Sequence, residues 1–450
     1  MLILTALLSL LAYKPHKLLK LLTGARRGGG RYYIGLSLLA IAVVLVACTL
    51  WDSSGSQDPY RDQAQRSVAP ERFDIFRWEV SAISSELAES VFYSQVDPAD
   101  PRAQSLVLAY LDRAQRIREL EREAEQVAAQ TKDEGQRSIR LASTLDELEN
   151  LRTRQAKVRP LVEHILEAQV AAVIREQHVG WLGRALPPPA FDFTEPPNYL
   201  VLSPRDRIEL RLGIYLIPTL SLETIEAIET RLENEIPNTS ALVSGTGGFS
   251  SWPTMIVDQA SLEWILSTIA HEWVHVYLAP YPLGRHYYAN QDTTAINETT
   301  AQIAGDELGR LALERYYPQL VETTGESAKP ADRSDDSSAG EQGFDFNREM
   351  RITRERVDQL LARGEVEKAE AYMEERRQFF VENGHFIRRL NQAYFAFHGT
   401  YRTGPAAPAE DPIAPRLRRL RQESPNLAAF LEEVRDMDSL DDLIARVPEP

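Results

Sequence analysis

The sequence predicts an α+β protein that is mostly helical, with a small mixed sheet near its centre. Long stretches on both sides of the centre repeat apolar residues at helical spacing, with charged residues between them. The central stretch instead alternates short β-branched and aromatic runs with amphipathic segments. Hydrophobic residues make up 43% of the 450-residue chain and charged residues 26%, which indicates globular domains rather than disorder.

The N-terminal segment is basic, whereas the rest of the chain is acidic. Residues 1–51 hold six basic residues and no acid, so the formal net charge of −16 leaves −22 on the remainder. Residues 34–51 are 18 consecutive uncharged residues, the short end of a membrane-spanning length. The positive-inside rule then places 1–33 in the cytosol and 52–450 on the extracytoplasmic side of a cell membrane. The acidic balance argues against nucleic acid as a partner.

Cys48 is the single cysteine of the sequence and closes the apolar run as "LVAC". This stretch resembles a bacterial lipoprotein signal, in which the cysteine is lipidated and becomes the first residue of the mature chain. The alternative is an uncleaved transmembrane helix with Cys48 packed near its end. Both interpretations tether the body to a membrane, and a lone cysteine excludes a disulfide framework or a thiolate metal site.

A polar linker is expected at 52–69, followed by a helical arm at 70–184. Within the arm, 105–130 and 137–177 show helical spacing on either side of a "KDEG" turn, which predicts a helical hairpin with a break or kink at Pro160. The hairpin is interpreted either as a subdomain packed on the body or as a coiled-coil-like stalk for self-association.

Five prolines between 185 and 199 mark the start of the next domain, expected at 185–321. Short apolar runs predict its strands, and amphipathic or apolar stretches predict its helices. The expected order is strands at 199–203 and 207–217, a helix at 221–235, strands at 240–244 and 252–258, and helices at 261–278 and 291–316.

The C-terminal third is expected to be helical and interrupted by polar segments. Residues 322–345 are acidic and almost free of apolar side chains, which predicts a flexible loop. A helical subdomain that completes a cleft is expected at 346–403, and a proline-rich linker with one or two short helices at 404–450. The subdomain's predicted helices are 346–363, 366–383 and 385–401.

The candidate chemistry lies in "TIAHEWVHVYL", residues 268–278. His271 and His275 are four residues apart, so a helix places both imidazoles on one face where they can share a metal. Glu272 between them can accept a proton from a metal-bound water, whose pKa the metal lowers. The flanking residues are apolar, which favours a helix buried beneath a cleft. The alternative is a core helix whose histidines are satisfied by hydrogen bonds.

A catalytic zinc needs a third protein ligand and an open position. No third histidine follows at short spacing, but the next predicted helix contains Asn297 and Glu298, with Glu298 23 residues beyond His275. In this the chain resembles the gluzincins, zinc peptidases in which an Asn-Glu pair after the HExxH motif supplies the third ligand. The alternative for Glu298 is a helix N-terminal acid favoured by the macrodipole.

The gluzincin resemblance implies a zincin-like catalytic domain with Zn²⁺ as its cofactor. It implies that His271, His275 and Glu298 bind the metal and that Glu272 is the general base of peptide-bond hydrolysis. Thermolysin-like members carry an Asp four residues after the ligand Glu, where this chain has Gln302. Gln302 is a weaker acceptor for an imidazole N–H, and Asp306 is a possible substitute one turn further on.

Peptide hydrolysis also needs a donor for the oxyanion of the tetrahedral intermediate. The stretch "LNQAYFAFHGTYR" at 390–402 places three candidates on one face of the predicted helix. We expect His398 or Tyr401 to be the donor and Tyr394 to be part of the core. Arg285 and His286, between the two ligand helices, are weaker candidates.

These patterns together predict a membrane-tethered zinc metallopeptidase that acts on a peptide or protein substrate. The segment "GGFSSWPTMI" at 247–256 is expected to be an edge strand that pairs with extended substrate. Two alternatives stay open. One is a non-catalytic envelope scaffold with a structural or relic zinc site, and the other is a zinc hydrolase of a non-peptide amide or ester.

Overall fold

A computed structural model describes most of the chain from residue 58 onward. The described residues are 58–75, 77–78, 82, 97–130, 134–180, 185–186, 188–287, 289–324, 344–400, 404–408 and 411–448. The predicted membrane segment 34–51, Cys48 and Tyr401 lie outside them, as does most of the predicted acidic loop. Across the described residues, no helix combines the length and apolarity needed to cross a membrane.

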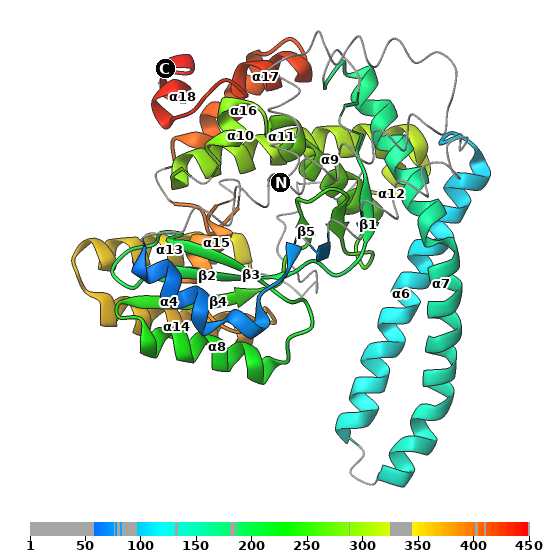
Figure 1. The fold of residues 1–450 in the computed structure, drawn as a ribbon, viewed down its shortest axis with the longest axis horizontal. Coiled ribbons are helices and arrows are strands. Elements are labelled where there is room, and N and C mark those ends of the chain that lie inside the picture. Colours follow the sequence, from blue (N-terminus) through cyan, green and yellow to red (C-terminus); the bar gives the residue numbers. More distant parts are fainter. Residues whose placement is uncertain are drawn as a thin grey trace.

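The body of the protein has two halves, from which a long helical hairpin projects (Figure 1). The hairpin consists of α6 (Pro101–Gln130) and α7 (Glu134–Glu176), which confirms its prediction. The sequence predicts a break or a kink at Pro160. A break is wrong, because α7 continues through this residue, and the kink stays a prediction. The carbonyl that loses its helical hydrogen bond belongs to Ala156, which is exposed and therefore accessible to water.

The first half, here called the helical half, contains one small mixed sheet and the helices that pack around it. Strand β6 lies between β1, which is parallel to it, and β5, which is antiparallel. One apolar core joins β1, β6 and the surrounding helices to the C-terminal part of α7, and β5 is attached through its pairing with β6. Its elements are β1 (Phe191–Phe193), β5 (Gly248–Phe249), β6 (Thr254–Ile256), α9 (Leu262–Leu278), α10 (Pro282–Arg285), α11 (Gln291–Tyr316), α12 (Pro318–Thr324), α16 (Ile413–Glu423), α17 (Leu427–Val434) and α18 (Leu440–Arg446).

The second half, here called the sheet half, is built on an antiparallel sheet of order β3-β2-β4. Helix α8 packs on this sheet through an apolar core, while α13 and α14 form a core of their own that includes Phe395 of α15. The elements are α4 (Pro59–Ser67), a 3₁₀ turn (Ala69–Glu71), β2 (Asn198–Pro204), β3 (Leu212–Leu216), α8 (Leu222–Glu235), β4 (Thr239–Ser244), α13 (Phe346–Ala362), α14 (Val366–Glu382) and α15 (Gln392–His398).

The predicted fold class is confirmed at the level of a mostly helical α+β protein, but with two small sheets in place of one. The linker prediction for 52–69 is wrong where α4 forms. Asp58 caps this helix by accepting a hydrogen bond from the Tyr60 N–H. Ala64 and Val68, four residues apart, are fully buried against the core of the sheet half. The polar composition of the segment conceals these two apolar positions.

Two boundaries and one number of helices also differ from the sequence prediction. The second strand is shorter than 207–217, because β3 begins at Leu212. The last helix of the C-terminal subdomain begins at Gln392 instead of 385, because Arg388 and Arg389 turn toward α8 to form ion pairs. The C-terminal tail forms three helices where one or two were expected.

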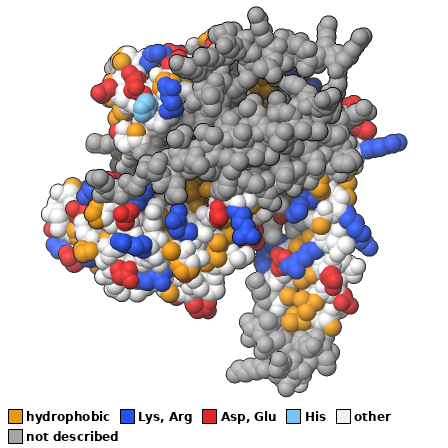
Figure 2. Space-filling model, viewed as in Figure 1, with side chains coloured by type: hydrophobic (Ala, Val, Ile, Leu, Met, Phe, Trp, Pro, Cys, Tyr) orange, Lys and Arg blue, Asp and Glu red, His pale blue; other side chains and the backbone are white. Residues whose placement is uncertain are grey.

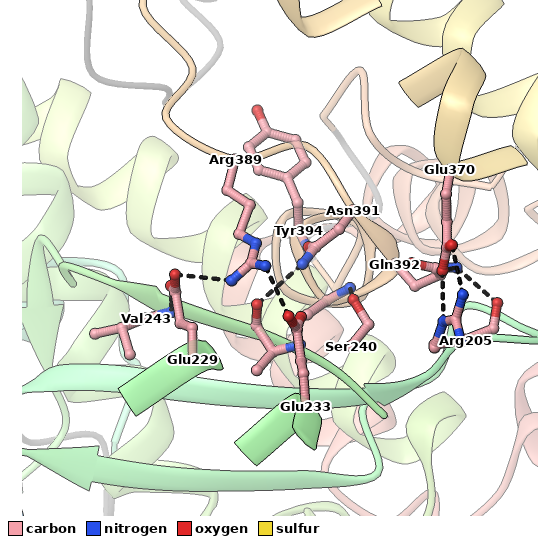
Figure 3. A network of polar contacts seen from close by, with 12 residues as sticks. Arg205, Glu229, Glu233, Ser240, Val243, Glu370, Arg389, Asn391, Gln392 and Tyr394 are labelled. Atoms are coloured by element: carbon pink, nitrogen blue, oxygen red, sulfur yellow. Dashed lines mark hydrogen bonds and ion pairs between the residues drawn. The ribbon is translucent and has the colours of Figure 1, made fainter. Parts of the chain in front are cut away.

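Both outer strands of the β3-β2-β4 sheet are covered. Beside β3, the Phe73 N–H donates to the Tyr215 carbonyl at 2.9 Å. Beside β4, carboxylates of α8 accept from two backbone N–H groups, Glu233 from Ala241 at 3.0 Å and Glu229 from Val243 at 2.7 Å. The β4 carbonyls are bound by Arg388 and Asn391 from the segment before α15. Figure 3 shows how the acids of α8 and Asn391 surround this strand.

In the β1-β6-β5 sheet, glutamate side chains cover one edge, which is formed by β1. Glu167 and Glu163 of α7 accept hydrogen bonds from the Phe191 and Phe193 N–H groups, at 2.9 and 2.6 Å. At the opposite edge lies β5, and no further strand pairs with it among the described residues. Side-chain carboxylates therefore close β1 in the way that they close β4, whereas β5 is an edge strand.

Charged side chains of both signs are interspersed on the surface of the protein. On the face shown in Figure 2, basic and acidic groups alternate over the described parts of the sheet half and the hairpin. Several of them form ion pairs between the two hairpin helices, such as Arg116 with Glu147 at 3.1 Å and Arg152 with Glu121 at 2.6 Å. Because these pairs are exposed, each contributes little to stability.

Candidate metal centre

The site is built on α9, a helix that is buried on all sides after its first turn. Ser261 caps it by accepting a hydrogen bond from the Trp264 N–H, and the helix runs to Leu278 without an interrupting proline. All residues from Ile265 to Leu278 are buried. A helix that is apolar all round belongs in a protein interior, so the polar side chains it carries there need partners.

Helix α11 crosses α9 at backbone contact. A Cβ atom added at Gly305 would lie 2.8 Å from the Cβ of His271, and one added at Gly309 would lie 2.5 Å from the Cα of Ser267. Real Cβ atoms do not approach so closely, so only glycine fits at these two positions. The close crossing brings Glu298, two turns before Gly305 on α11, to the histidines of α9.

Three ligand atoms converge at this crossing. The Nε2 atoms of His271 and His275 are 3.1 Å apart. The Oε2 atom of Glu298 lies 3.5 Å from the first and 3.7 Å from the second. These residues are only 4–6% exposed, and their ligand atoms all lie within 4.8 Å of one another. The structure therefore brings together the three residues that the sequence nominates as ligands.

The spacing of these atoms fits a tetrahedral metal ion. Bonds of about 2.0–2.1 Å at tetrahedral angles put ligand atoms about 3.3 Å apart. The three observed separations, 3.1, 3.5 and 3.7 Å, lie around this value. Glu298 Oε2 is also buried and makes no hydrogen bond within the described part of the chain, which is costly unless a cation binds it. Two imidazoles and a carboxylate form a donor set that suits Zn²⁺.

His275 is oriented by the residue that precedes the third ligand. Its Nδ1–H donates to the Oδ1 of Asn297 at 2.7 Å, and the Asn297 amide donates to the Leu283 carbonyl at 3.4 Å. Placing the proton on Nδ1 leaves Nε2 with a free lone pair that faces the other two ligand atoms. Asn297 is 1% exposed, so its hydrogen bond to His275 is shielded from water.

Tyr287 holds the other oxygen of Glu298. Its hydroxyl donates a short hydrogen bond to Oε1, and its ring stands edge-on to the His275 ring with the centroids 5.9 Å apart. The sequence analysis missed this residue. It lies in the loop between α10 and α11, beside the exposed candidates Arg285 and His286, and no periodicity distinguishes it from them.

The charges of the ligands support one another. Burial alone would lower the pKa of His275, but the neighbouring Glu298 carboxylate raises that pKa to about 9. Burial alone would raise the pKa of Glu298, but the two imidazoles hold it far below its usual range. The metal-free site therefore attracts a proton between its ligands, and a cation that binds there must displace it.

Glu272 lies on the side of α9 that faces the edge strand β5. A Cβ atom added at Gly248 would lie 2.8 Å from Glu272 Oε1 and 3.0 Å from the Cγ2 of Thr268. The absence of a side chain at Gly248 therefore leaves room for the carboxylate. Glu272 is 8% exposed. In the sequence it lies between the two candidate histidine ligands, and in space it lies against the edge strand β5.

The predicted oxyanion donor His398 makes ring contacts with residues of its own helix. His398 ends α15 in the sheet half, where its ring contacts Tyr394 and Phe397 of the same helix. Burial lowers its pKa to about 4, so the imidazole is neutral at neutral pH. Its role as oxyanion donor stays a prediction, as does that of Tyr401. His286 is exposed, and its Nδ1–H donates to the Pro282 carbonyl.

Gln302 stands where thermolysin-like enzymes carry an aspartate, and in the structure it is paired with an aspartate. The Gln302 amide donates a short hydrogen bond to the Asp306 carboxylate one turn further along α11. The two residues that the sequence offers as alternatives thus act as a pair. An amide that is oriented by an acid presents its carbonyl oxygen in a fixed direction.

Comparison with protein-family models, with curated proteins and with solved structures finds no match to this chain. The functional assignment therefore depends on the geometry of the site itself.

Proposed function

We propose that the protein is a zinc metallopeptidase of the gluzincin type. His271, His275 and Glu298 hold the zinc ion, and Glu272 is the general base and later the proton donor. The observation that carries this proposal is the convergence of three ligand atoms within 4.8 Å, with the Glu272 carboxylate on the same helix beside an edge strand.

When bound, zinc lowers the pKa of a coordinated water and polarises the substrate carbonyl. Glu272 accepts the proton of the attacking water, holds it on its carboxylate, and donates it to the leaving amine. The buried helices α9 and α11 keep bulk water away from the ligands and strengthen the electrostatic interactions within the site. Asn297 keeps the His275 imidazole in the tautomer that binds metal.

The proposed substrate is an extended peptide that adds to the edge of the β1-β6-β5 sheet. Carboxylates cover β1 and β4, and backbone covers β3, whereas β5 has no further strand beside it among the described residues. An edge strand pairs with a peptide through backbone hydrogen bonds and tolerates many sequences. Gly248 in β5 abuts Glu272, so a peptide paired with this strand would lie next to the general base.

The proposed peptidase is tethered to a cell membrane, with residues 52–450 on the extracytoplasmic side. This part of the proposal rests on the uncharged segment 34–51 and the basic residues before it. Either that segment or a lipid on Cys48 would be the anchor.

The decisive experiment measures bound metal in the full chain by elemental analysis after reconstitution with a mixture of divalent metals. We expect about one zinc per chain in the wild type and in Glu272→Gln. Glu298→Ala should lose the zinc, because two imidazoles alone bind it weakly. Glu263→Ala, an exposed acid on the same helix, is the matched control and should keep it.

Three results would contradict the proposal. Absence of zinc from the reconstituted wild type would remove the metallopeptidase assignment. Preference for another metal would redirect the chemistry, since two histidines and a carboxylate also suit Fe²⁺. A fully loaded wild type that cleaves no peptide would favour a scaffold with a structural metal or a hydrolase of another bond.

A further inference from the structure

We infer that Tyr287 is a positioning residue that keeps Glu298 a one-oxygen ligand and thereby keeps a coordination position of the metal open. This inference rests on the proposed function, because it concerns how the same site holds zinc. It adds a residue that belongs to neither the HExxH motif nor the helix that carries the third ligand.

The two oxygens of Glu298 have different surroundings. Oε1 accepts the hydrogen bond of the Tyr287 hydroxyl. Oε2 makes no hydrogen bond within the described structure and faces the two imidazole Nε2 atoms at 3.5 and 3.7 Å. The carboxylate is thus divided between a phenol and the metal position, and the division is present without a metal.

The placement of Tyr287 is fixed by the first turn of α11. Thr294 donates its hydroxyl hydrogen to the Tyr287 carbonyl in a short bond. Thr293 donates to the His286 carbonyl at 2.8 Å, and Asn290 caps the helix by accepting from the Thr293 N–H at 2.9 Å. Thr293 and Thr294 are 0% and 7% exposed, so these bonds are shielded from water.

The ring of Tyr287 is held as firmly as its backbone. It is half-buried and stands at 90° to the His275 ring. An edge-to-face pair of this kind stabilises both rings in one relative orientation. The hydroxyl is therefore presented to Oε1 by a rigid unit that includes one of the metal ligands.

This arrangement has a consequence for coordination. A carboxylate with both oxygens available can bind a metal through both and occupy an additional position. A catalytic zinc needs that position for water or substrate. By engaging Oε1, Tyr287 leaves a single oxygen for the metal. Asn297 acts on His275 in the same sense, since it leaves only Nε2 free to bind.

The test compares Tyr287→Phe with Tyr281→Phe in the full chain. Tyr281 is the matched control, because it precedes α10 in the same inter-helix segment and its ring packs against Tyr277 and Arg435 instead of the ligands. Two quantities are measured: zinc affinity by competition with a chelator, and the visible absorption of the Co²⁺-substituted protein, whose intensity reports coordination number.

We expect Tyr287→Phe to lower zinc affinity by about 10- to 100-fold, as loss of an outer partner does in other metal sites. Its cobalt bands should weaken, because a second carboxylate oxygen raises the coordination number. Thr294→Val, which keeps the phenol but removes the bond to its backbone, should change both quantities in the same direction by less. Tyr281→Phe should match the wild type.

Two outcomes would overturn the inference, and they are distinguishable. If the wild type binds zinc and Tyr287→Phe has the same affinity and cobalt spectrum, Tyr287 does not position Glu298, although the proposed function stands. A lowered kcat with both metal readouts unchanged belongs to this outcome, since the hydroxyl would then act on substrate. If the wild type binds neither zinc nor cobalt, the proposed function fails together with the inference.

Discussion

The two sheets of the protein differ at their edges. In the β3-β2-β4 sheet, backbone covers one outer strand and carboxylates of α8 cover the other. In the β1-β6-β5 sheet, carboxylates of α7 cover β1, while β5 lies beside the carboxylate of Glu272. Exposed edges promote aggregation, and proteins usually protect them. The proposed function gives this difference a reason, because a peptide substrate would pair with the β5 edge, here called the presented edge, next to Glu272.

The strongest test of this comparison is at the presented edge. Glu272→Gln keeps the size of the side chain but removes its ability to accept a proton. We expect kcat for peptide cleavage to fall by about 10³-fold, within the range of general-base catalysis. Zinc content should stay unchanged, because Glu272 is not one of the three converging ligands. Equal activity at equal zinc content would show that another group is the base.

At the protected edge of β4, the expected effect is on stability. Glu229 is 1% exposed and binds Arg388, Arg389 and the Val243 N–H. Glu229→Ala leaves the buried Val243 N–H without its acceptor and removes one carboxylate partner from each arginine, although Arg389 keeps Glu233. We expect the free energy of unfolding to fall by about 3 kcal/mol. We place this at the low end for a buried pair because both arginines remain 30% exposed.

Urea unfolding measures this change, with Glu226→Ala as the control. Glu226 is exposed on the same helix, so its substitution should change stability by less than about 0.5 kcal/mol. The zinc content of both variants should equal that of the wild type, because the metal centre lies in the other half. A loss of zinc in Glu229→Ala without a loss of stability would contradict the idea that the covered edge of β4 stabilises the fold and does not affect the metal centre.

A smaller effect is expected where β5 meets Glu272. In Gly248→Ala the new Cβ would lie 2.8 Å from Glu272 Oε1, so the carboxylate must shift. We expect kcat/KM to fall by about 10-fold, equivalent to about 1.4 kcal/mol, with zinc retained. Gly245→Ala is the control, because its nearest neighbour would be Asn198 Oδ1 at 4.0 Å. Similar losses in both variants would indicate a general effect of the loop.

The smallest expected effect is a change in the pH dependence of stability, caused by Glu163 at the covered edge of β1. Burial raises the pKa of the Glu163 carboxyl well above its usual value, despite the hydrogen bond from the Phe193 N–H. The folded state therefore binds this proton more tightly than the unfolded state. Stability contributed by the protonated group is present below the unfolded pKa of about 4.3 and is lost as pH rises through the folded pKa.

Glu163→Gln cannot ionise, but its carbonyl can accept the same N–H. The variant should therefore be more stable than the wild type at pH 8, and this advantage should shrink as the pH falls toward 4. Thermal unfolding at the two pH values measures it, with the exposed Glu149→Gln on the same helix as the control. A pH-independent difference would show that Glu163 stays ionised in the folded protein.

The parts of the structure that are encoded by local patterns could be predicted from the sequence. Residues 291–316 have the predicted helix boundaries, and 261–278 differs only in that Ser261 is the cap. The meeting of His271 and His275 follows from helical spacing, and the choice of Glu298 as third candidate ligand follows from the resemblance to gluzincins. These features depend on residues within one or two turns, or on a pattern that the chemistry of zinc imposes.

Other features depend on residues far apart in the chain. Glu229 and Arg388 are 159 positions apart, and no local pattern announces their ion pair or the shortening of α15 that accompanies it. The predicted domain 185–321 contributes strands to both halves of the body. Strands β2–β4 pack with α8, whereas β1 and β6 join the core of the helical half and β5 pairs with β6. Tyr287 was missed for a related reason. Its partner is Glu298, which it reaches from a loop, where side-chain direction follows no period.

The most direct test of the central claim is cleavage of a mixed-sequence peptide library by the zinc-loaded full chain, read by mass spectrometry. The same assay is run with Glu272→Gln loaded with the same amount of zinc. We predict new peptide termini with the wild type and almost none with the variant, because both bind the metal and only one has the base. No cleavage by a fully loaded wild type, or equal cleavage by both proteins, would contradict the account.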